Sequence, residues 1–154
     1  MGISCMSDEY EQTMSGVIEQ WLLKAIGDEY EATKLDLLGG RDAKTYVAKL
    51  LSAAETVVYS NQGEPQALVA YYCNDRETLT CFISMVIVSR AARGRGVALG
   101  LVSSVLASAA ERGFKRCCLE VYSRNEPAIR LYRRLGFVAT GGRAELTIME
   151  REIK

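Results

Sequence analysis

The sequence contains no histidine among its 154 residues, and this absence excludes a large part of enzyme chemistry. Serine–histidine and cysteine–histidine nucleophile systems cannot be built, and neither can a metal site with histidine ligands. Proton transfer must therefore use a carboxylate, a tyrosine, a lysine, a cysteine or water. The five cysteines form no C-x-x-C pair and their number is odd, which favours a reduced, cytoplasmic protein without a metal site.

Long apolar runs are also missing, because no stretch approaches the ~18 residues of a membrane span. The first ten residues show no basic start followed by an apolar stretch, so we expect no secretory signal and no membrane partner. Prolines are few, and the length matches one domain of ~150 residues. We therefore expect a single domain over residues 1–154.

The net charge is zero, but the two halves of the chain differ strongly. Residues 1–77 contain six basic and thirteen acidic residues, whereas residues 78–154 contain thirteen basic and six acidic ones. A basic half suits an anionic ligand, and an acidic half suits a cationic acceptor such as an amine. The alternative is that two solvated faces differ by chance. A net charge of zero also argues against a nucleic-acid partner.

The spacing of apolar residues predicts an α/β protein. In the first half it predicts helices over 9–26 and 42–53, joined by the stretch 24–41, and strands over 56–60, 66–72 and 78–88. In the second half it predicts a helix over 96–112, a strand over 115–123, a helix over 126–135 and a strand over 144–153. This order indicates a hairpin-rich sheet with one strand–helix–strand crossover.

The segment Arg93-Gly94-Arg95-Gly96-Val97-Ala98 lies between a predicted strand and a predicted helix. Free N–H groups and the positive end of a helix dipole make such a junction an anion site, and glycines allow close approach. The alternative is a tight surface turn with solvated arginines. A dinucleotide fingerprint fails because Leu99 occupies the position of its third glycine, and the G-K-[ST] of a P-loop is absent.

This loop resembles the acyl-CoA-binding motif Q/R-x-x-G-x-G/A of the GNAT superfamily of N-acyltransferases, with Ala98 in its last position. The segment from Asn125 to Phe137 resembles the family's later motif N-x-x-A-x-x-L-Y-x-x-x-G-F. Together the two motifs cover about residues 79–138. The resemblance implies a GNAT-like α/β fold with a mostly antiparallel mixed sheet, one splayed parallel strand pair and flanking helices. It also implies acetyl-CoA as the cosubstrate.

The same resemblance assigns site residues. Those expected to bind the cosubstrate are Val86, Ile87, Val88, Arg93, Gly94, Arg95, Gly96, Val97, Ala98, Asn125, Ala128 and Tyr132. Tyr132 matches the general acid that protonates the leaving thiolate, and the alternative is a core aromatic on the apolar stripe of its helix. Asn125 matches a residue that contacts the pantetheine arm, and it is also a good helix N-cap.

Glu120 is the candidate base, placed mid-strand where some family members deprotonate the amine through water. Burial would suit it to this role, and the alternative is a solvent-facing or salt-bridged glutamate. The predicted function is direct transfer of an acetyl group to the primary amine of a small molecule in a ternary complex. The alternatives are an N-terminal acetyltransferase of the ribosomal-protein type, which Leu119–Phe137 resembles, and a CoA-binding sensor without turnover.

Family members usually begin with a strand before the first helix, and here only Met1–Asp8 is available. Ile3-Ser4-Cys5 is therefore either a very short strand or a sign that this strand is missing. An uncovered first edge would bear on a possible homodimer. Residues 24–60 carry no acceptor motif.

Overall fold

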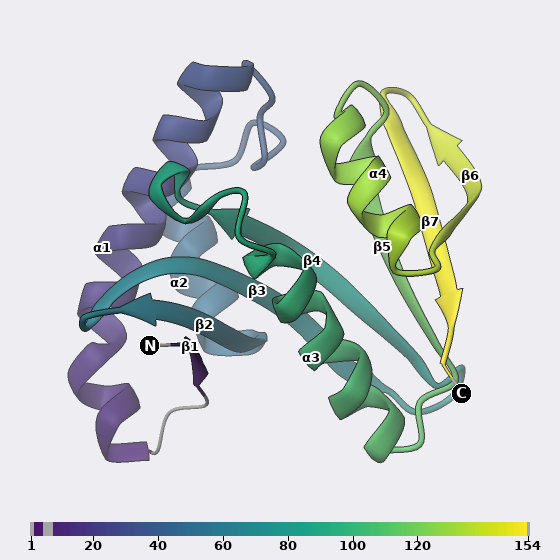
Figure 1. The fold of residues 1–154 in the computed structure, drawn as a ribbon, viewed down its shortest axis with the longest axis horizontal. Coiled ribbons are helices and arrows are strands. Elements are labelled where there is room, and N and C mark those ends of the chain that lie inside the picture. The colour runs from purple at the N-terminus through teal and green to yellow at the C-terminus, as the bar shows by residue number, and fades with distance from the viewer. Residues whose placement is uncertain (1, 5–7, 154) are drawn as a thin grey trace.

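The computed structural model describes residues 2–4 and 8–153, with side chains from residue 15 onward. Seven strands form one sheet in the order β1-β2-β3-β4-β5-β7-β6 (Figure 1). In chain order the elements are β1 (Gly2–Ser4), α1 (Asp8–Thr33), α2 (Ala43–Ala53), β2 (Glu55–Asn61), β3 (Glu64–Asp75), β4 (Thr80–Val88), the 3₁₀ turn η1 (Arg90–Ala92), α3 (Val97–Glu111), β5 (Arg116–Tyr122), α4 (Glu126–Arg134), β6 (Val138–Arg143) and β7 (Leu146–Glu152). The predicted mixed α/β fold is confirmed.

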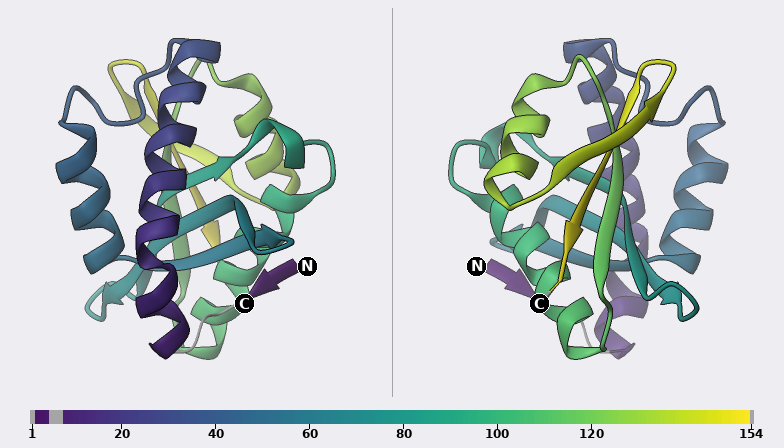
Figure 2. Two further views of the ribbon diagram at one scale, coloured as in Figure 1. Left: turned by 90° about the vertical axis from the view of Figure 1, so that its left-hand side faces the viewer. Right: turned by 90° about the vertical axis from the view of Figure 1, so that its right-hand side faces the viewer.

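Helices cover both faces of the sheet (Figures 1 and 2). Helices α1 and α2 pack on one face, where Leu22 and Val47 are fully buried against residues of β3 and β4. Helix α3 packs on the other face through buried residues such as Leu101 and Val105. The apolar stripe of each helix follows the helical period and produces these two separate cores.

A bulge at Ser84 changes the direction of the side chains along β4. The register with β3 pairs Tyr71 with Ile83 and Ala70 with Met85, which leaves Ser84 without a partner. Before the bulge, Ile83 belongs to the core under α3, whereas after it Met85 belongs to the core under α1 and α2. One extra residue reverses the alternation of a strand. The odd-numbered side chains of β4 therefore point toward α3 before the bulge and toward α1 and α2 after it.

Strands β4 and β5 are the parallel pair among the seven strands described, and they separate part-way along. Their register runs from Thr80 opposite Arg116 to Ile83 opposite Leu119 and then stops. Residues 84–88 therefore have no partner on β5. Crossover through α3 forces both strands to run in one direction, and the gap opens at their carboxyl ends, where open sheets bind ligands.

The structure corrects the predicted elements at several places, and β3 runs over Glu64–Asp75 rather than 66–72. The first helix, predicted over 9–26, extends to Thr33. The prediction stopped early because the last turns are solvated and charged, as in the Lys24–Asp28 pair at 2.8 Å, and show no apolar period. Strand β6 was missed because all six of its residues are exposed and two are glycines. The strand expected from residue 78 begins at Thr80, because residues 78–79 form a turn capped by Asp75.

The uncertain first strand exists as Gly2–Ser4 and pairs antiparallel with β2, whereas Cys5 lies outside the described residues. Within residues 8–153, no helix is long and apolar enough to cross a membrane.

Candidate active site

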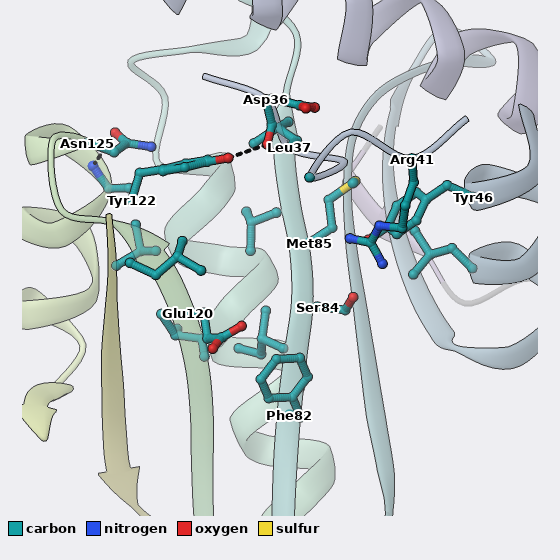
Figure 3. Close-up of a pocket in the computed structure, with 18 of the residues that line it drawn as sticks. Asp36, Leu37, Arg41, Tyr46, Phe82, Ser84, Met85, Glu120, Tyr122 and Asn125 are labelled. Atoms are coloured by element: carbon teal, nitrogen blue, oxygen red, sulfur yellow. Dashed lines mark hydrogen bonds between the residues drawn. The ribbon is translucent and has the colours of Figure 1, made fainter. Parts of the chain in front are cut away.

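A cavity of about 910 Å³ lies where β4 and β5 separate (Figure 3). It is walled by residues 82–86 of β4, residues 119–122 of β5, the start of α4 and a segment between residues 36 and 50 that includes the cavity-facing side of α2. The volume is typical of small-molecule sites, and the walls mix apolar and charged side chains. Both sides of the sheet contribute, because the bulge at Ser84 turns neighbouring side chains of β4 in different directions.

The cavity brings together five of the predicted site residues. They are Val86, Glu120, Asn125, Ala128 and Tyr132. The loop 93–98 and residues Ile87 and Val88 lie outside its lining. Ile87 is buried in the core under α1 and α2, so its side chain points away from the face of the sheet that α3 covers. Only its backbone could contribute to a ligand in the gap.

Tyr132 fits both interpretations that the sequence left open. Its side chain is 8% exposed and its ring packs edge-on against Phe137, with 5.8 Å between the ring centroids. It also lines the cavity, and its hydroxyl has no hydrogen-bond partner within the described part of the chain. Burial, with a smaller effect of Cys117, raises the pKa of Tyr132 to about 12. The phenol therefore keeps its proton throughout the physiological range.

Glu120 faces the cavity from β5, but it is not deeply buried. Its side chain is 29% exposed and forms an ion pair with Arg143 at 3.1 Å. Arg143 also donates to both carboxylate oxygens, from Nε to Oε2 and from Nη2 to Oε1, each at 3.2 Å. The salt-bridged alternative therefore describes Glu120 in this structure, and a proton acceptor here must first give up part of this pair.

The loop before α3 has the backbone geometry of an anion site. Gly94 and Gly96 adopt left-handed conformations with φ of +78° and +72°. Gly96 is the N-cap of α3 and supplies no side chain to cap it. Within the described residues, the N–H groups of residues 94–99 have no hydrogen-bond acceptor. These free donors at a helix N-terminus suit a negatively charged group.

Arg93 is committed to the protein itself. Its Nε donates to the carbonyl of Val88 at 3.1 Å, and its Nη2 pairs with the carboxylate of Glu29 on α1 at 2.5 Å. The prediction that this guanidinium adds charge for an anion is therefore not supported by its position. Arg95 is exposed and has no ion pair among residues 15–153, so it is the free cation of the loop.

Comparison with known proteins decides the family. The profile of the acetyltransferase (GNAT) family matches residues 17–137, more than three quarters of the chain. The chain belongs to the GNAT family. This finding confirms the family that the two motifs indicated.

Individual relatives agree with the assignment of this chain to the GNAT family. The N-alpha-acetyltransferase MAK3 of Arabidopsis thaliana is 38% identical over 63 residues, which are 41% of this chain and 33% of that protein. The match thus spans only about a third of that curated relative. The ribosomal-protein-S18-alanine N-acetyltransferase from Escherichia coli has the same fold at 17% identity, with a TM-score of 0.71 over 99% of this chain and 93% of that one.

A GNAT family acetyltransferase from Elizabethkingia anophelis with acetyl-CoA bound also shares the fold. It is 16% identical, with a TM-score of 0.63 over 71% of this chain and 82% of that one. At these identities the two structures show the fold alone.

Asn125 caps helix α4 of this GNAT protein. Its side-chain oxygen accepts from the N–H of Ala128 at 3.3 Å, and Pro127 occupies the first turn. The capping alternative is therefore correct for the side-chain oxygen. Because Asn125 also lines the cavity, its amide NH₂ is still available to a ligand.

The sequence missed the cavity wall formed by residues 36–50. Tyr122 secures this wall, because its hydroxyl donates to the carbonyl of Asp36 across the cavity mouth (Figure 3). One signal was present in the sequence, since the alternation of side chains along the predicted strand 115–123 puts Tyr122 on the same face as Glu120. Tyr46 and the segment before it carried no recognisable motif.

The charge argument for a cationic acceptor does not extend to this cavity. Of the acidic residues between positions 15 and 77, whose side chains the structure describes, only Asp36 and Asp42 line it, and so do the basic residues Arg41 and Lys49. Both carboxylates are bound to backbone donors. Asp36 accepts from Leu38 N at 2.9 Å, and Asp42 accepts from Thr45 N at 3.0 Å, which lowers the pKa of Asp42.

Proposed function

We propose that this protein transfers an acetyl group from acetyl-CoA directly to a primary amine. The observation that carries the proposal is the convergence of Tyr132 and Glu120 on one cavity, at the point where β4 and β5 separate. The free N–H groups of residues 94–99 would hold the pyrophosphate of the cosubstrate. The unpaired edge of β4 would hold the pantetheine arm and direct the thioester toward the cavity.

Each group then has a separate task in the reaction. Glu120 takes a proton from the ammonium form of the acceptor, directly or through water, once Arg143 has moved away from it, so that the neutral amine attacks the thioester carbon. The nitrogen loses its second proton to solvent as the C–S bond breaks and the thiolate leaves. Backbone N–H groups of β4 beyond Ile83 stabilise the negative charge that develops on the thioester oxygen. No covalent intermediate on the protein is required, in line with the buried, unreactive surroundings of Cys73, Cys81 and Cys117.

Tyr132 serves the departing sulfur mainly as a hydrogen-bond donor. A phenol whose pKa is about 12 holds its proton more tightly than an ordinary thiol of pKa ~8.5. Full proton transfer to the thiolate is therefore uphill, whereas donation of a hydrogen bond still stabilises the leaving group. This refines the role of general acid that the resemblance implied.

The acceptor that we propose is a small molecule, because the cavity volume of about 910 Å³ matches that of small-ligand sites. In this arrangement residues 1–77 contribute most of the acceptor side, and residues 78–154 hold the acyl-CoA. The free thiols suit a reduced, cytoplasmic setting. A homodimer stays a prediction.

A second candidate acceptor is the α-amino group of a protein N-terminus. It is favoured by the identity of 38% with the Arabidopsis N-alpha-acetyltransferase over 63 residues. The two candidates make opposite demands on the cavity mouth, since a polypeptide needs an open path for its chain whereas a small molecule does not.

An acceptor panel tests these proposals. The purified protein is incubated with acetyl-CoA and either small amines or peptides with a free N-terminus, and products are identified by mass. Acetylation of small amines with kcat/KM at least tenfold above that of the peptides supports the first candidate, and the reverse order supports the second. A thermal unfolding temperature that rises with acetyl-CoA, without any acetylated product, would support a sensor.

A further inference from the structure

The cavity contains two cationic side chains that form no ion pair with any residue among 15–153, on the wall that faces Glu120 from the other side. Arg41 comes from the loop between α1 and α2, and Lys49 comes from α2. Neither has an ion pair among residues 15–153, although both line the cavity. We propose that they bind a carboxylate of the acceptor, which is therefore an amino acid that presents its amine to Glu120. This inference rests on the proposed acetyl transfer.

The guanidinium of Arg41 is held in place while most of its donors stay free. Its Cζ lies 4.4 Å from the centroid of the Tyr46 ring, and its Nε donates to the carbonyl of Leu38 at 2.5 Å. These two contacts leave both Nη groups available, and Figure 3 shows the group turned toward Ser84 and Met85 of β4. A planar guanidinium that is already oriented binds a carboxylate through two parallel hydrogen bonds.

Lys49 adds a second donor from the same wall. It lies one helical turn beyond Thr45 on α2, and both residues line the cavity, as expected for positions i and i+4. Its ammonium ends a flexible stem, so it can reach an anion that Arg41 has already oriented. Lys44 offers a natural comparison, since it is exposed on α2 but does not line the cavity.

The nearby acids do not neutralise these cations through direct pairing. Asp36 accepts from the backbone N–H groups of Leu38 and Gly40, and Asp42 accepts from the N–H and hydroxyl of Thr45. On the far wall Arg143 already pairs with Glu120, so the unpaired positive charge lies on the wall of Arg41 and Lys49. An amino acid complements this arrangement, because its ammonium is drawn to Glu120 and its carboxylate to the opposite side.

Matched acceptor pairs test the proposal. Glycine, β-alanine and γ-aminobutyrate are each compared with the corresponding carboxamide, which keeps the shape and removes the charge. Binding is measured by calorimetry with CoA present, and transfer is measured separately as kcat/KM with acetyl-CoA. Because hydrogen bonds to charged groups are strong, at least one amino acid of this series should bind tenfold or more tightly than its carboxamide.

Substitutions assign the preference to named residues. Arg41→Gln and Lys49→Gln should each lower the ratio of carboxylate to carboxamide affinity about three- to tenfold, through KM rather than kcat. Arg41→Lys should keep part of the preference, and Lys44→Gln should leave it unchanged. Thermal unfolding of every variant shows that the fold is intact.

Two binding results would overturn the inference. One is equal binding of carboxylate and carboxamide in all three pairs, or binding of neither. The other is a loss in Lys44→Gln as large as in Lys49→Gln. The outcome for acetyl transfer is separate. Carboxylate-selective binding without product contradicts the proposed function alone, and equal acetylation of both members of each pair contradicts this inference alone.

Discussion

Arg93 and Glu29 join the loop before α3 to helix α1 through an ion pair of 2.5 Å. The two residues are 64 positions apart in the sequence, and Trp21 reinforces the same junction by donating to the hydroxyl of Ser89 at 3.0 Å. The loop that would hold the cosubstrate is thereby fastened to the helix that precedes the acceptor wall. Arg93 is thus a positioning residue for the loop.

This ion pair should appear as a coupling energy in a double-mutant cycle. Arg93→Gln and Glu29→Gln, alone and combined, should show about 0.5–1 kcal/mol of interaction in urea unfolding, because both side chains are only partly buried. The pair Lys24 and Asp28, which is far more exposed, serves as control and should couple less. Fully additive effects of Arg93→Gln and Glu29→Gln would show that the junction does not stabilise the fold.

Gly94 should be intolerant of alanine because of its backbone conformation. A Cβ there meets nothing within 4 Å, so the strain comes from φ of +78° and should cost about 1–2 kcal/mol. Gly27→Ala, in the exposed part of α1, should instead raise the free energy of unfolding by up to about 1 kcal/mol. We also expect Gly94→Ala to weaken acetyl-CoA binding. Equal effects of the two substitutions in urea unfolding would contradict this account.

Removal of the Tyr132 hydroxyl should slow turnover without weakening the binding of CoA. Tyr132→Phe keeps the edge-on contact with Phe137, so the fold should survive, and kcat should fall about 10²-fold. Steady-state kinetics and calorimetric titration with CoA measure the two effects. If kcat stays within a factor of two of wild type, Tyr132 is only a core aromatic.

Loss of the Glu120 carboxylate should also lower kcat. Glu120→Gln preserves the shape and a hydrogen bond to Arg143 but removes the proton acceptor, so kcat should fall about 10²-fold or more. The control is Glu152→Gln at the end of β7, away from the cavity. Arg143→Gln tests whether the ion pair itself is needed for turnover. This variant should retain activity, because Glu120 is released from the pair but keeps its carboxylate. Unchanged kcat in Glu120→Gln would assign proton removal to another group or to solvent.

Stability should decline at alkaline pH. Burial raises the pKa of Tyr132 to about 12 in the folded state, against 10.0 for a free tyrosine. The unfolded chain therefore loses this proton at a lower pH than the folded chain does. The contribution of this group to the free energy of unfolding is fully present below pH 10 and is lost as pH rises toward 12. Urea unfolding should show a loss of roughly 1 kcal/mol by pH 11 from this group. Tyr132→Phe should lose less over the same interval, and an identical decline would contradict the assignment.

The sequence predicted those parts of the fold that depend only on residues close together in the chain. The alternation of β5 placed Leu119 and Glu120 on opposite faces, and Asn125 before Pro127 marked the start of α4. Family motifs then located the loop at Gly94 and Gly96. These features are local, so one segment of sequence is enough to recognise them.

The remaining features depend on contacts between distant segments. The bulge at Ser84 appears only in the register of β4 with β3. Nothing in the sequence pairs Arg93 with Glu29, or Glu120 with Arg143, because those partners are set by the packing of separate elements. Strand β6 is an exposed edge that lacks the apolar alternation on which strand prediction depends.

The central claim is acetyl transfer to an amine in the cavity between β4 and β5, and the mass of the acceptor tests it most directly. Wild type and Tyr132→Phe are incubated with acetyl-CoA and the amine panel, and free CoA thiol is measured alongside. Our account predicts that at least one amine gains one acetyl group for each thiol released, and that Tyr132→Phe forms this product about 10²-fold more slowly. Thiol release without any acetylated amine, or equal rates in both proteins, would contradict it.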